Sequence, residues 1–182
     1  MKHYMKLASS AVILLLISLS SYAASTPSPI GYWQTINKDT NRPSSIIKIY
    51  PAKSTIAGKA TSVINGKILG TYLYGEKRKE PAPRCKKCDG KLENTPIVGL
   101  PIITNFKQTG KNSWHGGTLL SPRTGSTYEN VTLSLANNNQ LLRVHVKVGF
   151  FSQTEVWHRI SLPLIKEIKQ SEKQADFKLL MQ

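Results

Sequence analysis

The chain has 182 residues, of which 40% are apolar and 19% are charged, and these values exclude a disordered chain and a protein with many membrane spans. Its 25 Lys and Arg residues against 10 Asp and Glu give a formal net charge of +15, and two cysteines are too few for a small fold built on several disulfides. The length suits one domain better than two.

Residues 1–23 have the pattern of a secretory signal peptide. Lys2 and Lys6 form a short positive segment, and residues 7–19 are apolar apart from small serines. Small residues follow, as a cleavage site after Ala23 requires. A transmembrane anchor is the alternative, but it needs roughly 20 apolar residues, and this run is shorter. We therefore predict an exported protein with a cleaved signal peptide, in an oxidising compartment such as a periplasm or outside the cell.

Export changes the interpretation of the positive charge. Nucleic acid is rarely met outside the cytoplasm, so we predict no nucleic-acid partner. Anionic lipid, polysaccharide or cell wall would attract the chain, and self-repulsion alone would also keep it in solution. No further apolar run predicts an integral membrane protein.

After a linker at 24–29, apolar and polar residues alternate over most of 30–161, and this period of two is typical of strands. The clearest example is 142–148. The predicted strands span 30–36, 44–51, 54–64, 97–106, 112–120, 126–136, 140–148 and 153–161. The clearest turns are at 37–39, 122–125 and 137–139.

Short connections between these strands favour an antiparallel up-and-down meander. A meander of about eight strands has two open edges unless it closes into a barrel. We therefore predict an all-β barrel, with a two-sheet sandwich as the alternative. Such a barrel is filled by side chains or holds one small ligand, and the pattern favours neither. The one long connection is 65–96.

The tail at 162–182 has a different pattern. Apolar residues are loosely spaced as in a helix, among Lys and Glu. We predict a short amphipathic helix, either a frayed surface helix or one that binds a partner or membrane surface.

Two resemblances support the barrel. Gly31-Tyr32-Trp33 opens the first predicted strand, and Arg159 lies near the end of the last. This arrangement resembles the Gly-x-Trp and distal Arg of lipocalin-like barrels. The resemblance implies that Trp33 closes one end of the barrel and that Arg159 lies across its ring, a favourable cation–π contact.

The wider pattern resembles the bacterial exported family called domain of unknown function 2147, over roughly residues 30–161. The matching elements are Gly31-Tyr32-Trp33, Ile46 to Tyr50, Cys85-Lys86-Lys87-Cys88, Ile97 to Leu100, Trp114 to Gly117, Pro122 to Tyr128 and Val156 to Arg159. The resemblance implies a lipocalin-like barrel, export and a two-cysteine loop, and it supplies no activity.

Cys85 and Cys88 lie in the long connection, and three interpretations remain open. Exported cysteine pairs are usually oxidised, and a disulfide closing so short a loop would stabilise the fold by about 2 kcal/mol. Neighbouring cations would favour a reactive thiolate, although a thioredoxin-type pair belongs at a helix N-terminus of an α/β fold. Zinc would need two further ligands, and no His has the spacing of a zinc finger. We predict no metal and no cofactor.

The same connection concentrates positive charge. We interpret it as a docking patch for an anionic envelope component, with a solvated loop as the alternative. The cations concerned are Lys77, Arg78, Lys79, Arg84, Lys86, Lys87 and Lys91.

No catalytic motif is visible, so we predict a binding protein and no enzyme. Its ligand would be a small amphipathic molecule in the barrel or an anionic envelope component at the basic loop. A thiol redox or metal-handling protein centred on the two cysteines is the alternative. The candidates for lining or closing the barrel are Trp33, Tyr50, Trp114, Tyr128, Trp157 and Arg159.

Overall fold

The computed structural model describes residues 26–172 and 176–182, so the predicted signal peptide lies outside the described residues. The strands are β1 Gly31–Asn37, β2 Arg42–Ile56, β3 Lys59–Tyr74, β4 Pro101–Gly110, β5 Ser113–His115, β6 Thr118–Leu120, β7 Thr127–Tyr128, β8 Val131–Ala136, β9 Leu141–Val148, β10 Phe151–Ile160 and β11 Phe177–Met181. The helices are the short 3-10 helices η1 Gly75–Lys79 and η2 Gly90–Leu92 and the α-helix α1 Leu162–Ser171.

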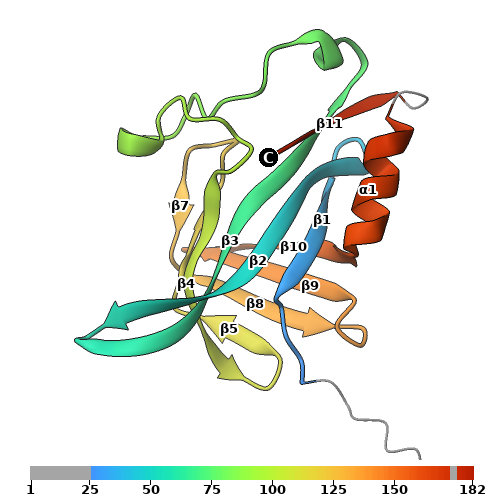
Figure 1. The fold of residues 1–182 in the computed structure, drawn as a ribbon. Coiled ribbons are helices and arrows are strands. Elements are labelled where there is room, and N and C mark those ends of the chain that lie inside the picture. Colours follow the sequence, from blue (N-terminus) through green and yellow to red (C-terminus); the bar gives the residue numbers. More distant parts are fainter. Residues whose placement is uncertain (1–25, 173–175) are drawn as a thin grey trace, which may run out of the picture.

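The strands close into an antiparallel barrel of eight, which confirms the predicted fold class (Figure 1). When β5 with β6, and β7 with β8, are each counted as one barrel strand, every barrel strand pairs with the next along the chain, β3 pairs with β4 across the long connection, and β10 returns to pair with β1. The pairs β5–β6 and β7–β8 each supply one barrel strand in two pieces. Closure gives every long strand a partner on both sides, which removes the open edges of a meander.

The interruption between β5 and β6 has a steric cause. A side chain at Gly117 would collide with the carbonyl oxygen of Thr104 and with the ring of Phe106 on β4. Gly116 has a positive φ of 76°. The two glycines therefore allow a bend at which the backbones approach closely.

The predicted boundaries were wrong around the second hairpin. The turn between β2 and β3 lies at Ala57-Gly58, where both residues have positive φ, and Pro51 is paired with Ile64 inside the ladder. The hairpin is therefore longer than predicted, and β3 continues to Tyr74, so the long connection begins at residue 75. A tight two-residue turn with two positive φ values keeps the twist that a long ladder needs.

The tail is a helix followed by a strand. Ser161 caps α1 by accepting a hydrogen bond from the Leu164 amide (3.4 Å), as expected of a helix N-cap. The strand β11 was not predicted. It pairs with the last residues of β3, from Phe177 opposite Tyr74 to Met181 opposite Gly70. In the described part of the tail, α1 and β11 are therefore packed against the barrel.

Two apolar clusters hold the molecule together. The larger fills the barrel interior and includes all three tryptophans together with isoleucine, valine and leucine side chains from β2, β3, β4, β6, β8 and β9. The smaller lies outside the barrel, where Ile165 of α1 and Leu179 of β11 pack against Ile46 and Tyr72. The second cluster explains why the tail keeps a fixed position.

Candidate functional site: the two ends of the barrel

At one end of the barrel Arg159 is held over the ring of Trp33. The guanidinium carbon lies 4.2 Å from the ring centroid of Trp33, and the indole N–H donates to the Pro29 carbonyl (2.8 Å). Trp33 is completely buried. The contact is the one that the lipocalin-like resemblance implies.

Three backbone carbonyls accept the guanidinium N–H groups of Arg159. They belong to Asn139 (2.6 Å), Ile30 (3.0 Å) and Ser28 (2.6 Å). Burial lowers the pKa of Arg159 from its ordinary value, because desolvation disfavours the charged form. Arg159 thus joins the segment before β1 to the turn between β8 and β9, and all its interactions serve the fold.

Gly31 makes that contact possible. Its φ is 132°, and a Cβ there would lie 2.9 Å from a terminal nitrogen of Arg159. Only glycine adopts this backbone region readily and leaves room for the guanidinium. The Gly-x-Trp pattern therefore has a physical basis in the Arg159 contact.

The other aromatic candidates are distributed between interior and surface. Trp114 and Trp157 are buried in the interior cluster, and Tyr128 packs against it while partly exposed. Tyr50 lies opposite Asn65, on the face of β2 that points away from Ile49 and the interior. The tryptophans thus occupy the space in which a ligand of the barrel would sit.

A small hollow remains near the segment before β1. It has a volume of about 300 Å³ and is lined by Pro29, Ile30, Pro51, Phe106 and Trp114, among others. A second cleft of about 470 Å³ lies outside the barrel between α1, β11 and the first three strands, lined by Tyr72, Tyr74 and Phe177. Burial raises the pKa of both tyrosines in this cleft.

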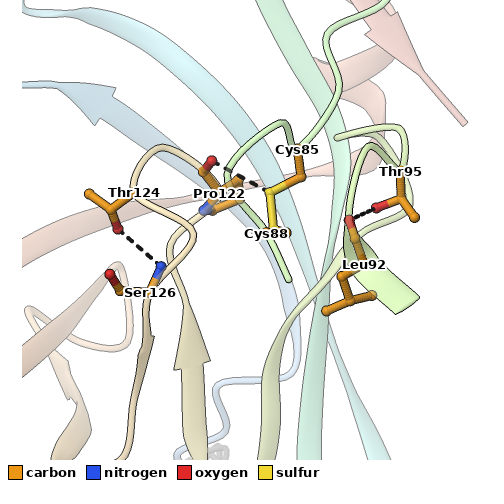
Figure 2. Close-up of a disulfide and its surroundings, with 7 residues drawn as sticks. All are labelled: Cys85, Cys88, Leu92, Thr95, Pro122, Thr124 and Ser126. Atoms are coloured by element: carbon orange, nitrogen blue, oxygen red, sulfur yellow. Dashed lines mark hydrogen bonds between the residues drawn. A yellow bond between two sulfur atoms is a disulfide. The ribbon is translucent and has the colours of Figure 1, made fainter. Parts of the chain in front are cut away.

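At the opposite end, the long connection folds onto the barrel (Figure 1). Cys85 and Cys88 form a disulfide, which confirms the predicted bond. Both belong to the interior cluster, with 0% and 3% of their surface exposed. Figure 2 shows the sulfur of Cys85 facing the carbonyl of Pro122 in the turn between β6 and β7, at 3.6 Å.

Backbone hydrogen bonds fix the connection around the disulfide. The amide of Cys85 donates to Thr95 (2.8 Å), and the carbonyl of Cys85 accepts from Asn94 (2.9 Å). Thr95 also donates through its hydroxyl to Leu92 (Figure 2). A Cβ at Gly125 would collide with the Lys87 carbonyl, so this glycine allows the connection to lie against the turn between β6 and β7.

All seven predicted cations of the connection are exposed, in two groups. Lys77, Arg78 and Lys79 lie on η1, where Lys79 pairs with Glu76 (3.1 Å). Arg84 donates to the Asn94 carbonyl (2.6 Å). We call Lys86, Lys87 and Lys91 the clamp lysines, because two of them lie between the bonded cysteines and the third follows three residues after Cys88.

The clamp lysines are available for an external anion. In residues 26–172 and 176–182 no carboxylate lies within ion-pair distance of any of the three. Their backbone is fixed by the disulfide and by the hydrogen bonds around it. The backbone that carries these three cations is therefore positioned before any partner arrives.

Redox and metal chemistry have little geometric support here. The disulfide sulfurs are buried, whereas reactive cysteines are partly exposed. Within the described residues no group of three or more His, Cys, Asp or Glu side chains is placed to hold a metal ion. No helix in the same residues is long and apolar enough to cross a membrane.

One prominent surface feature was missed from the sequence. Phe150 and Phe151, at the tip of the hairpin between β9 and β10, are almost completely exposed. The sequence shows two phenylalanines after Gly149, but a local pattern does not tell whether side chains at a two-residue turn are buried or exposed.

Comparisons with known proteins agree on the family and the fold. The family model described as "uncharacterized protein conserved in bacteria (DUF2147)" matches residues 31–159. A solved structure, protein HP1028 from the human pathogen Helicobacter pylori, described as belonging to the lipocalin family, is 22% identical with a TM-score of 0.57. The alignment covers 79% of this chain and 90% of that one. A search of curated proteins found no match.

Proposed function

The chain belongs to the bacterial family DUF2147, and from this premise we propose that it is an exported binding module for an anionic component of the cell envelope. The binding surface is the loop clamped by Cys85 and Cys88. The lipocalin-like fold supports binding rather than catalysis.

The observation that carries this proposal is the combination of charge and rigidity in the clamp lysines. Three exposed ammonium groups without ion-pair partners in the described residues lie on a backbone fixed by a disulfide. A cation that is already positioned loses less entropy on binding than one on a flexible loop. This arrangement favours recognition of an anion over mere solubility.

A ligand inside the barrel has less support. Trp33, Trp114 and Trp157 are each buried in one interior cluster, where a ligand of the barrel would have to displace them. The hollow near the segment before β1 is about 300 Å³, the lower limit for a small-molecule site. The loop therefore remains the better candidate.

The test is a charge-matched comparison of two triple variants. K86S/K87S/K91S removes the clamp lysines, and the control K53S/K59S/K111S removes three exposed lysines from the opposite end of the barrel. Binding to dextran sulfate, an anionic polysaccharide, is measured over a salt series. Each lysine near a negative surface contributes about 1 kcal/mol, so we expect a loss of about 100-fold for the clamp variant.

The control variant should lose far less than the clamp variant, although both lower the net charge equally. Equal losses in the two variants would mean that total charge alone causes binding, and the proposal would fail. Binding by the wild type should also weaken as salt is added, because exposed charges are screened.

A further inference from the structure

The hairpin between β9 and β10 ends in an exposed apolar tip. Phe150 is fully exposed, Phe151 is 83% exposed and the neighbouring Val148 is 54% exposed. We call these three residues the aromatic tip. Isolated apolar residues are common on protein surfaces, but three adjacent ones at the end of a hairpin are a contiguous patch that water solvates poorly.

The tip has a fixed shape. Val148 pairs directly with Phe151, so the loop contains only Gly149 and Phe150. Gly149 has a positive φ of 57°, and a two-residue loop with glycine first is a favoured connection for a tight hairpin. The chain therefore presents the Phe150 ring to solvent at the end of the hairpin.

Cations lie on the outer face of the same hairpin. Arg143 and Lys147 of β9 are exposed and lie opposite Val156 and Ser152 of β10. Lys38, from the turn between β1 and β2, donates to the carbonyl of Thr154 on β10 (3.4 Å). Lys147 is thus next to the aromatic tip, and Lys38 and Arg143 lie farther along the same hairpin.

The acidic groups of this region do not neutralise these cations. Glu155 lies opposite Val144 of the core and accepts from the indole N–H of Trp157 (3.4 Å), so it faces the interior. Asp39 follows Lys38, and Glu129 is next to Asn130, whose carbonyl accepts from the Lys147 amide. In the part of the chain that the structure describes, neither forms an ion pair.

We propose that the aromatic tip inserts into the surface of an anionic lipid bilayer, with Lys38, Arg143 and Lys147 facing the lipid head groups. Aromatic rings are favoured at the boundary between head groups and acyl chains, and nearby lysines and arginines are attracted to anionic lipid. A convex tip of two rings suits a deformable bilayer better than a protein partner, which would need a matching pocket. This inference goes beyond the proposed function and does not depend on the clamp lysines.

The experiment uses F150W in the full chain and vesicles of phosphatidylglycerol and phosphatidylcholine. The native tryptophans are all buried, so a change in emission on adding vesicles reports the introduced ring. We expect a blue shift and protection from a water-soluble quencher with anionic vesicles, and a smaller effect with phosphatidylcholine alone. An unchanged spectrum with saturating anionic vesicles would overturn the proposal.

Sedimentation with vesicles then compares F150S/F151S with the matched control L162S/L164S, which removes two exposed leucines from α1. Each ring removed should weaken partitioning about tenfold, and the control should bind as the wild type does. Equal binding by all three proteins would overturn the proposal. So would binding lost equally in the two double variants.

The same variants separate this inference from the proposed function. F150S/F151S should bind dextran sulfate as the wild type does, because that probe has no apolar phase. K86S/K87S/K91S should keep the blue shift of the F150W reporter. A tip variant that loses both probes would indicate a folding defect, so its circular dichroism and thermal transition must match the wild type for the comparison to count.

Discussion

Both ends of the barrel contain positively charged side chains, but these lie in opposite environments. At one end the partly buried Arg159 lies over the buried ring of Trp33, and three carbonyls accept the guanidinium N–H groups. At the other end the clamp lysines are exposed, and in the described residues they have no ion-pair partner.

The difference separates cations that serve the fold from cations that are available to a ligand. Removing a cation even partly from water is costly unless it has partners, and Arg159 has three backbone carbonyls within the protein. The clamp lysines remain solvated and incur no such cost. Partners and burial, rather than residue type, therefore decide which end is the candidate site.

The largest effect should come from truncating the buried ring. Trp33→Ala removes the ring under Arg159 and leaves a cavity, and we expect it to lower the free energy of unfolding by about 3–5 kcal/mol. Urea denaturation followed by circular dichroism measures the change. If this variant cannot be purified, Trp33→Phe replaces it, with a smaller expected loss of unfolding free energy. A Trp33→Phe variant as stable as the wild type would show that Trp33 does not stabilise this end of the barrel.

Replacing the partly buried Arg159 should have the next largest effect. Arg159→Leu removes three hydrogen bonds from a charged donor, and we expect a loss of about 2–4 kcal/mol by the same measurement. Arg159→Lys should recover only part of the lost stability, because an ammonium lacks the planar arrangement of N–H donors of a guanidinium. Arg143→Leu, at an exposed position, is the control. An equal loss of unfolding free energy in this variant would mean that burial and hydrogen-bond partners do not distinguish the two kinds of cation.

The disulfide should matter less than the buried pair at the opposite end. Cys85→Ser/Cys88→Ser should lower the free energy of unfolding by about 2 kcal/mol, because closing so short a loop removes little entropy from the unfolded chain. Hydrogen exchange should increase at the Cys85 and Asn94 amides and stay unchanged around Trp33. Faster exchange throughout the barrel would show that the loop holds the whole fold together.

The smallest effect on stability should come from the clamp lysines. K86S/K87S/K91S should change the free energy of unfolding by less than about 0.5 kcal/mol, as expected for exposed side chains without special contacts. Its thermal transition should therefore match that of the control K53S/K59S/K111S. A loss as large as that of Arg159→Leu would assign the clamp lysines to the fold and remove the contrast between the two ends.

Much of the architecture was predictable because it depends on local patterns. Alternation identified 142–148 as a strand, and the asparagines at 137–139 all adopt the positive φ expected of that turn. The end of β3 and the whole of β11 were missed. Their residues are buried by a helix outside the barrel, and a second buried face hides the alternation that a one-sided strand shows.

The candidate site was only partly predictable for a related reason. The spacing of Cys85 and Cys88 and the surrounding lysines mark the loop in the sequence. Which lysines remain without an ion pair depends on contacts such as that between Lys79 and Glu76. The exposure of Phe150 depends on the hairpin register, which no local pattern records.

The sequence by itself predicted an all-β meander of about eight strands and marked the cysteine pair, because alternation and spacing are properties of the chain. The contact between Trp33 and Arg159 was predicted only through the resemblance to lipocalin-like barrels. Only the tertiary structure decided that three tryptophans fill the interior, that the tail adds a strand to β3 and that an aromatic tip faces solvent. Burial is the reason. It is set by segments far apart in the chain, and the same residue type stabilises the fold when it is covered and is available to a partner when it is not.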